Sequence, residues 1–188
     1  MPPTARTAAA LACTLTLAAL SPRFAHATGA CAGTATVTQS NSLKSITVKT
    51  TDNPICLRIS EAAGTLSFVP DPPGTTVVGG LKALAGVTKI TVKLSNHRDM
   101  LTLSTLAIPG VDLVVKGRDG GNFIVMDGVE VRKLTLDGGK SEDNVDAADV
   151  TVERKSRISG GPGDSDRFTV VGELVGPIDV KNFEEIRP

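Results

Sequence analysis

The chain has 188 residues, in which 20 lysines and arginines balance 20 aspartates and glutamates, and it contains no tryptophan or tyrosine. The balanced charge leaves no basic field to attract nucleic acid or anionic lipid, and the composition offers no Trp or Tyr ring to stack on a sugar. A chain of this length forms one domain by default.

Residues 1–27 have the three parts of a cleavable secretory signal. Arg6 precedes an apolar stretch, Ala8 to Leu20, and Ala25-His26-Ala27 is a small-x-small cleavage site before Thr28. The apolar stretch is well short of the roughly 20 residues that cross a bilayer as a helix. We therefore expect cleavage between Ala27 and Thr28, no membrane span, and a protein that is secreted or held at the cell surface.

Two cysteines, Cys31 and Cys56, remain after this cleavage. In an oxidising compartment an isolated pair more often forms a disulfide than two free thiols. The bridge would close a loop of 25 residues (56 − 31), worth about 3 kcal/mol in the chain-entropy model. It would pin residues 28–45, which we predict to form a cap at the N-terminal end.

Residues 46–188 are dominated by short runs of Val, Ile, Leu and Thr separated by Gly, Asp, Asn and Pro, which is typical of strands and turns. An apolar-x-apolar triplet recurs with a mean spacing of 22 residues (132/6). Its first residues are Ile46, Leu66, Ile90, Leu113, Leu134, Ile158 and Ile178. A repeat of this length predicts a solenoid, here with six to seven coils.

Two further apolar runs follow most triplets, so each unit is predicted to form one three-sided turn of a parallel β-helix. Stacked turns share an aliphatic core that no single turn could bury by itself. Met100, Phe123 and Phe168 share the tenth position of their units, and we expect them to stack inside. An antiparallel β-sandwich is the alternative, but it does not explain the repeat length.

The stretch from Leu113 to Val180 contains LTLDGGKSEDNVDAADVTV and ISGGPGDSDRFTVVGELVGPIDV. It resembles the Gly- and Asp-rich solenoid repeats of secreted bacterial proteins of the planctomycete surface-protein type, over about half of the chain that follows the signal. The resemblance implies a right-handed parallel β-helix exposed outside the cell. It carries no catalytic residue with it.

One position, eight or nine residues after the triplet start, is polar in four successive units. Its residues are Asp99, Asn122, Asp143 and Asp166. Stacking predicts that they form a ladder, in which carboxylates about 4.8 Å apart repel by roughly 1 kcal/mol even in water. Calcium, or the neighbouring Arg98 and Arg167, would compensate that charge, and a row of solvated turn residues is the alternative.

Residues 160–166, GGPGDSD, resemble the calcium-binding nonapeptide of the repeat-in-toxin family. The resemblance implies calcium ligands at Asp164 and Asp166, and Asp143 of the ladder completes the candidate metal set. The motif departs from the family pattern at Ser165 and occurs once, whereas calcium rolls use tandem copies. Calcium is thus the one candidate cofactor, and a calcium-stabilised repeat domain is one alternative function.

Catalytic residue types cluster at Asn96-His97-Arg98-Asp99. Asp99 with Lys93, Arg98 or Arg118 would suit polysaccharide lysis or hydrolysis, and a polar corner is the other interpretation. No recognised enzyme motif is present, so no catalytic residue is assigned.

Our first hypothesis is a non-enzymatic extracellular β-solenoid that acts as a structural or surface-interaction module. It would be a monomer whose partner is an unidentified extracellular or cell-surface molecule and not nucleic acid. A small carbohydrate-active β-helix enzyme, of the polysaccharide lyase or hydrolase type, is the alternative.

Overall fold

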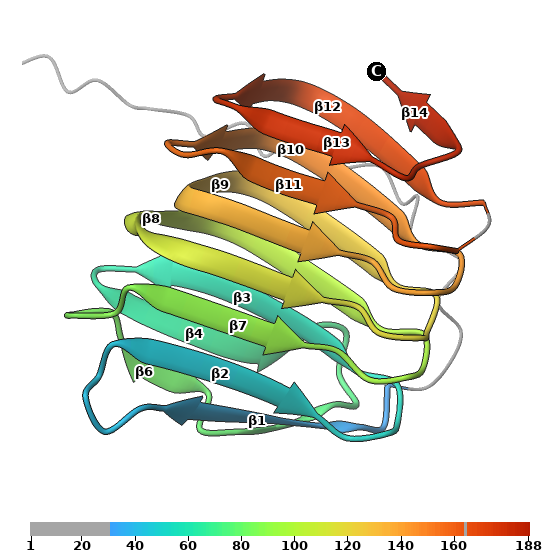
Figure 1. Cartoon of the computed structure of the whole chain (residues 1–188). Coiled ribbons are helices and arrows are strands. Elements are labelled where there is room, and N and C mark those ends of the chain that lie inside the picture. Colours follow the sequence, from blue (N-terminus) through green and yellow to red (C-terminus); the bar gives the residue numbers. More distant parts are fainter. Residues whose placement is uncertain (1–30, 164) are drawn as a thin grey trace, which may run out of the picture.

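The computed structural model describes residues 31–163 and 165–188, which form a β-solenoid of stacked rungs (Figure 1). The signal, its cleavage site at Ala27 and Thr28, and Asp164 lie outside the described residues. The strands are β1 (Thr34–Gln39), β2 (Ser45–Thr50), β3 (Cys56–Ala62), β4 (Thr65–Pro70), β5 (Thr76–Val78), β6 (Leu81–Ala83), β7 (Lys89–Lys93), β8 (Met100–Lys116), β9 (Phe123–Asp137), β10 (Asn144–Val152), β11 (Ser156–Ser159), β12 (Arg167–Val175), β13 (Ile178–Lys181) and β14 (Glu185–Arg187). The described residues contain no helix with the length and apolarity to cross a membrane.

The regular part of the solenoid is parallel, from β7 to β13. One column of paired residues runs through Thr91, Val114, Thr135, Arg157 and Asp179, with offsets of 23, 21, 22 and 22 residues. These offsets confirm the repeat length predicted from the triplets. The parallel pairing rules out the antiparallel β-sandwich.

Each regular turn bends through three strand segments, as the pattern of apolar runs predicts. In β8 and β9 the segments are continuous, and β8 pairs with β9 at Met100–Ser104, Leu106–Ile108 and Asp112–Lys116. Matching corner positions carry a left-handed backbone, with φ of 48° at Thr105, 62° at Gly128 and 52° at Asp149. A glycine adopts this conformation without strain, whereas a β-branched residue such as Thr105 does so at a cost.

The N-terminal end departs from this regular pattern. Ile46 pairs with Ile90, 44 residues later (90 − 46), because antiparallel pairings of β3 with β4 and of β4 with β6 occupy the interval. The triplet at Leu66 therefore belongs to a hairpin strand and does not start a coil. About four regular turns result, where the triplet count predicts six to seven coils.

Two features close the N-terminal end. The antiparallel pair of β1 and β2 lies at this end in Figure 1, and β1 falls within the segment that the sequence predicts as a cap. Cys31 and Cys56 are at disulfide distance, with their Cα atoms 5.6 Å apart. At the opposite end, the short strand β14 pairs with β12.

The core is a set of inward columns, one of which consists of Leu101, Ile124, Val145 and Phe168, all buried. The predicted stack of Met100, Phe123 and Phe168 is wrong, because Met100 and Phe123 pair with each other on the outward, half-exposed side. The sixth triplet starts at Ser156 and not at Ile158, since Ile158 pairs with Leu136 and Ser156 pairs with Ile178. Neighbouring strand residues face opposite sides, so a small error in phase reverses the predicted face.

Candidate functional site

One corner of the solenoid brings together most of the residues that the sequence marks as candidate site residues. Loops at 94–99, 117–122, 138–143 and 160–166 join the strand segments on either side of it. They are rich in Gly, Asp, Asn and Ser, which favour turns. An inner layer of this corner is a buried polar ladder, and basic side chains line its outer rim.

The inner layer is the predicted ladder, and it is buried. Asp99, Asn122, Asp143 and Asp166 are each no more than 1% exposed, so the alternative of solvated turn residues is wrong. Hydrogen bonds link successive rungs. The Oδ1 atom of Asp143 accepts from the backbone N–H of Asn122 at 2.7 Å, and Oδ1 of Asp166 accepts from that of Asp143 at 2.7 Å.

The ladder continues at both ends through other side chains. Asp99 accepts from the backbone N–H of Ile55 at 2.8 Å and from both the N–H and the hydroxyl of Ser95. Glu184 accepts from the backbone N–H of Asp166 at 2.6 Å. The carboxylates therefore satisfy backbone donors that the corner would otherwise bury without partners.

The Asn122 amide shows which groups surround the second polar atom of a ladder side chain, the one that does not point to the next rung. Its Nδ2 atom donates to the carbonyls of Gly117, Gly120 and Gly138 at 3.2, 2.6 and 3.0 Å. Asp143 carries an oxygen, Oδ2, at the matching place, and this oxygen is buried with no hydrogen-bond partner among the described residues. A Cβ built on Gly138 would lie 2.6 Å from it, so the site requires glycine.

Burial, with a smaller contribution from the nearby carboxylates of Asp166 and Asp137, raises the pKa of Asp143 to about 7, although the hydrogen bonds from Asn122 lower it. Burial also raises the pKa of Asp99, although the hydrogen bonds from Ile55 and Ser95 oppose this. The predicted compensation by arginine is not observed at Arg167, whose Nε donates to Glu185 at 2.7 Å. A proton on Asp143 would instead turn Oδ2 into a donor like the Asn122 amide.

The sequence-predicted metal ligands are only partly described. Asp143 and Asp166 lie on adjacent rungs, as predicted, whereas Asp164 is outside the described residues. Within residues 31–163 and 165–188, no group of three or more His, Cys, Asp or Glu side chains is arranged to hold a metal ion. The calcium site therefore stays a prediction.

The candidate catalytic cluster does not assemble on one surface. His97 and Arg98 are exposed, but Asp99 points into the ladder and is 1% exposed. Its carboxylate holds three hydrogen bonds to Ile55 and Ser95, so a substrate cannot reach it without opening the corner.

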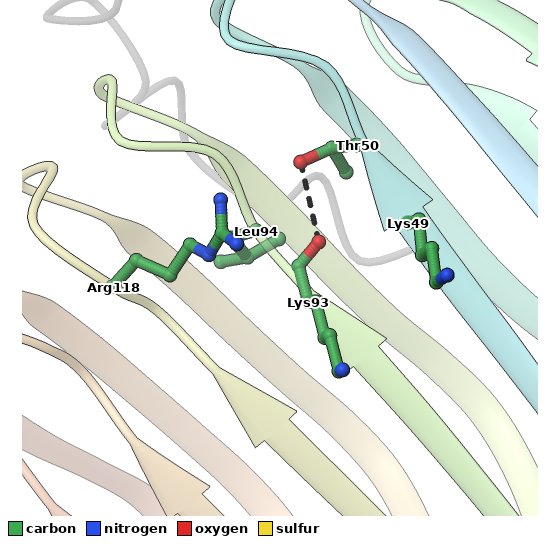
Figure 2. A pocket seen from close by; sticks show the side chains of 5 residues that line it. All are labelled: Lys49, Thr50, Lys93, Leu94 and Arg118. Atoms are coloured by element: carbon green, nitrogen blue, oxygen red, sulfur yellow. Dashed lines mark hydrogen bonds between the residues drawn. The ribbon is translucent and has the colours of Figure 1, made fainter.

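The outer layer of the corner is a depression of about 270 Å³ lined by Lys49, Thr50, Lys93, Leu94 and Arg118. Figure 2 shows the basic side chains coming from β2, from β7 and from the loop that follows β8. The Thr50 hydroxyl donates to the carbonyl of Lys93 at 3.2 Å and ties the two strands together. No carboxylate lines this depression among the described residues.

Lys116 extends the same row by one rung. Lys49 pairs with Lys93, and Lys93 pairs with Lys116, in the register of β2, β7 and β8. We call Lys49, Lys93, Lys116 and Arg118 the basic strip. Its members take part in none of the ion pairs found among the described residues.

Sequence reasoning missed the basic strip, although a signal for it was present. In each of three units a lysine directly follows the triplet, as in Ile46-Thr-Val-Lys49, Ile90-Thr-Val-Lys93 and Leu113-Val-Val-Lys116. The balanced total charge concealed this local alignment, because it sums the charges of the chain without regard to where they lie.

Comparisons with protein-family models, with curated proteins and with solved structures find no match. The resemblance to secreted bacterial repeat proteins therefore stays a prediction, and function must be argued from the geometry of this chain.

Proposed function

We propose that this protein is an exported, non-enzymatic β-solenoid that acts as a surface-interaction module and contacts its partner through the basic strip. The observation that carries the proposal is the row of unpaired cations on consecutive rungs. Lys49, Lys93 and Lys116 stand next to one another and take part in none of the ion pairs among the described residues, and the first acid in the column is Asp137, one rung beyond Lys116.

Such a row is unfavourable in the free protein. Two unit charges 4 Å apart repel by about 1 kcal/mol in water, and opposed like charges on neighbouring strands are destabilising. Six cations outside the strip form ion pairs with acids in the described part of the solenoid, among them Arg132 with Asp112 and Lys140 with Asp119. A negatively charged partner would relieve the repulsion along the strip, so a binding role accounts for it.

A non-enzymatic role is favoured over the glycoside-hydrolase alternative by the chemistry of the depression. Glycoside hydrolysis generally uses two carboxylic acids on either side of the bond that breaks. The described lining supplies Lys, Arg, Thr and Leu instead, and the candidate acid Asp99 is buried in the ladder. These groups can hold an anion but offer no acid–base pair of carboxyls.

The test is retention of the purified protein on a panel of immobilised neutral and acidic polysaccharides, with assays for new reducing ends and for unsaturated products in the same wells. We expect retention without products. Release of either product would favour the enzyme, and failure to be retained on any surface would overturn the interaction role. A calcium titration of the melting temperature, run in parallel, tests the calcium-stabilised alternative.

A further inference from the structure

We propose that the basic strip binds a linear acidic polysaccharide, whose carboxylate or sulfate groups lie along the solenoid axis over Lys49, Lys93 and Lys116. This inference rests on the proposed interaction role and names the chemistry of the partner. It is argued from the register, the neighbouring side chains and the limits of the strip.

The register sets the spacing of the charges. Residues paired between adjacent parallel strands are about 4.8 Å apart, so three consecutive lysines span about 10 Å along the axis. Lys49 and Lys116 are exposed and Lys93 is half-buried, which leaves all three ammonium groups within reach of a ligand on the surface. A linear polymer with one negative group per sugar can place successive charges over this row.

Arg118 adds a different kind of cation at the edge of the row. Its guanidinium is a planar fork of N–H donors that suits the two oxygens of a carboxylate or sulfate. Arg118 is exposed and lines the same depression as Lys49 and Lys93 (Figure 2). The strip thus combines point charges along the axis with one site able to orient an oxyanion.

The column beside the lysines is suited to sugar hydroxyls. Thr47 and Thr91 pair with each other, and each stands two residues before a lysine of the strip, on the same outward face. Their half-buried hydroxyls can donate to and accept from uncharged hydroxyl groups. A sugar chain offers both anionic and hydroxyl groups to these two columns.

The strip has defined ends. The lysine column continues after Lys116 with Asp137, which would repel an anion, and the more distant Lys181 pairs with Asp179 at 3.2 Å. The site therefore accommodates a short segment of an acidic chain, and a polyanion would not be attracted along the whole rod.

A polysaccharide fits better than a nucleic acid. The described lining of the depression has no aromatic ring on which a sugar or a base could stack, so binding here rests on charges and hydroxyl groups, whereas proteins that bind single strands rely on stacked bases as well. The formal charge of the chain is zero, and screening limits surface attraction to about 8 Å at physiological salt. A densely charged phosphate backbone would find no extended basic field here.

The experiment compares the wild type with the triple variant Lys49→Gln, Lys93→Gln, Lys116→Gln. Binding to polygalacturonate, dextran sulfate, neutral dextran, an oligothymidylate and phosphatidylglycerol vesicles is measured by biolayer interferometry at several salt concentrations. A second triple variant, Lys44→Gln, Lys82→Gln, Lys155→Gln, makes the same change of charge away from the strip and serves as the matched control. Arg118→Gln alone tests the guanidinium.

We expect the strip variant to bind an acidic polysaccharide at least about tenfold more weakly than the wild type, and its binding to depend less on salt. The control variant should stay within about twofold of the wild type. Circular dichroism of each variant checks that the solenoid is intact. We expect it to be intact, because the substituted side chains project from outward positions.

Three outcomes would overturn the inference. They are equal loss in both triple variants, binding of an oligothymidylate or of phosphatidylglycerol vesicles as tight as that of the polysaccharide, and retention on neutral dextran that no strip variant changes. In the last case an interaction role stands, but this ligand assignment and the placement of the contact on the basic strip both fail. Retention on no surface at all would overturn the interaction role itself.

Discussion

The buried ladder makes the stability of the protein depend on pH, and Asp143→Asn is the substitution that isolates the effect. In the unfolded chain the Asp143 carboxyl ionises near its ordinary pKa of 3.8, whereas burial raises the pKa in the folded protein to about 7. Between these values the folded state holds a proton that the unfolded state has released. The free energy of unfolding therefore falls as the pH rises from about 4 to about 7.

The magnitude follows from the two pKa values. A tenfold difference in proton affinity is worth about 1.4 kcal/mol, so a pKa raised from 3.8 to about 7 corresponds to about 4 kcal/mol lost at neutral pH. The side chain introduced by Asp143→Asn would be neutral at every pH. Its amide would face backbone carbonyls as the Asn122 amide faces those of Gly117, Gly120 and Gly138.

We expect the Asp143→Asn protein to be more stable than the wild type near pH 7.5, by as much as about 4 kcal/mol, and to lose this advantage near pH 4. Urea unfolding followed by far-ultraviolet circular dichroism is the suitable assay, because the chain has no Trp or Tyr to report by fluorescence. Asp99, whose pKa burial also raises, adds a slope of the same sign to both proteins.

Two opposite contributions act at lower pH and are common to both proteins. Hydrogen bonding to Arg132 lowers the pKa of Asp112, and hydrogen bonding to Arg187 and Arg167 lowers that of Glu185, so their stabilisation is lost as the pH falls below about 4. Asp127→Asn, at an exposed outward position, serves as the control and should keep the wild-type slope. Identical pH profiles for the wild type and Asp143→Asn would refute the reasoning.

Three further predictions concern the scaffold. Thr105→Gly should raise the free energy of unfolding by about 1 kcal/mol, because Thr105 holds a φ of 48° that glycine adopts freely, and an unchanged melting temperature would contradict this. Gly138→Ala should destabilise by at least about 2 kcal/mol, since the new methyl group meets the ladder, whereas Gly110→Ala, with open space around it, should be nearly neutral in the same urea assay. Replacing Cys31 and Cys56 by serine should cost about 3 kcal/mol, measured against the oxidised wild type, and equal stability of the reduced and oxidised proteins would argue against a closed bridge.

Several features of the fold followed from the sequence because they depend on local periodicity. The triplets at Ile90, Leu113 and Leu134 are in register in the structure, and their spacing alone predicted stacked parallel turns. The ladder was also predictable, since a polar residue at one phase of a repeat must stack on its equivalents in the next turn. The pairing of Cys31 with Cys56 was predictable because these are the two cysteines that remain after the predicted cleavage.

Other features depended on pairings between distant segments. The hairpin of β3 and β4 replaces one expected coil, and its triplet at Leu66 looks like the others in sequence. The triplet of this turn begins at Ser156, two residues before the apolar Ile158 that marks it in the sequence. Counting from Ile158 therefore gave Phe168 the same position in its turn as Phe123, a position that the two do not share. Only the register shows that Phe168 lies inside and Phe123 outside.

The sequence by itself determined the repeat length, the strand segments and the polar position that forms the ladder, because each follows from hydrophobic alternation over a few residues. Only the tertiary structure decided that the ladder residues are at most 1% exposed and that three lysines from separate strands form one row. The physical reason is that burial and charge proximity are properties of how turns stack. Residues 44 positions apart, such as Lys49 and Lys93, become neighbours only when the chain closes its turn.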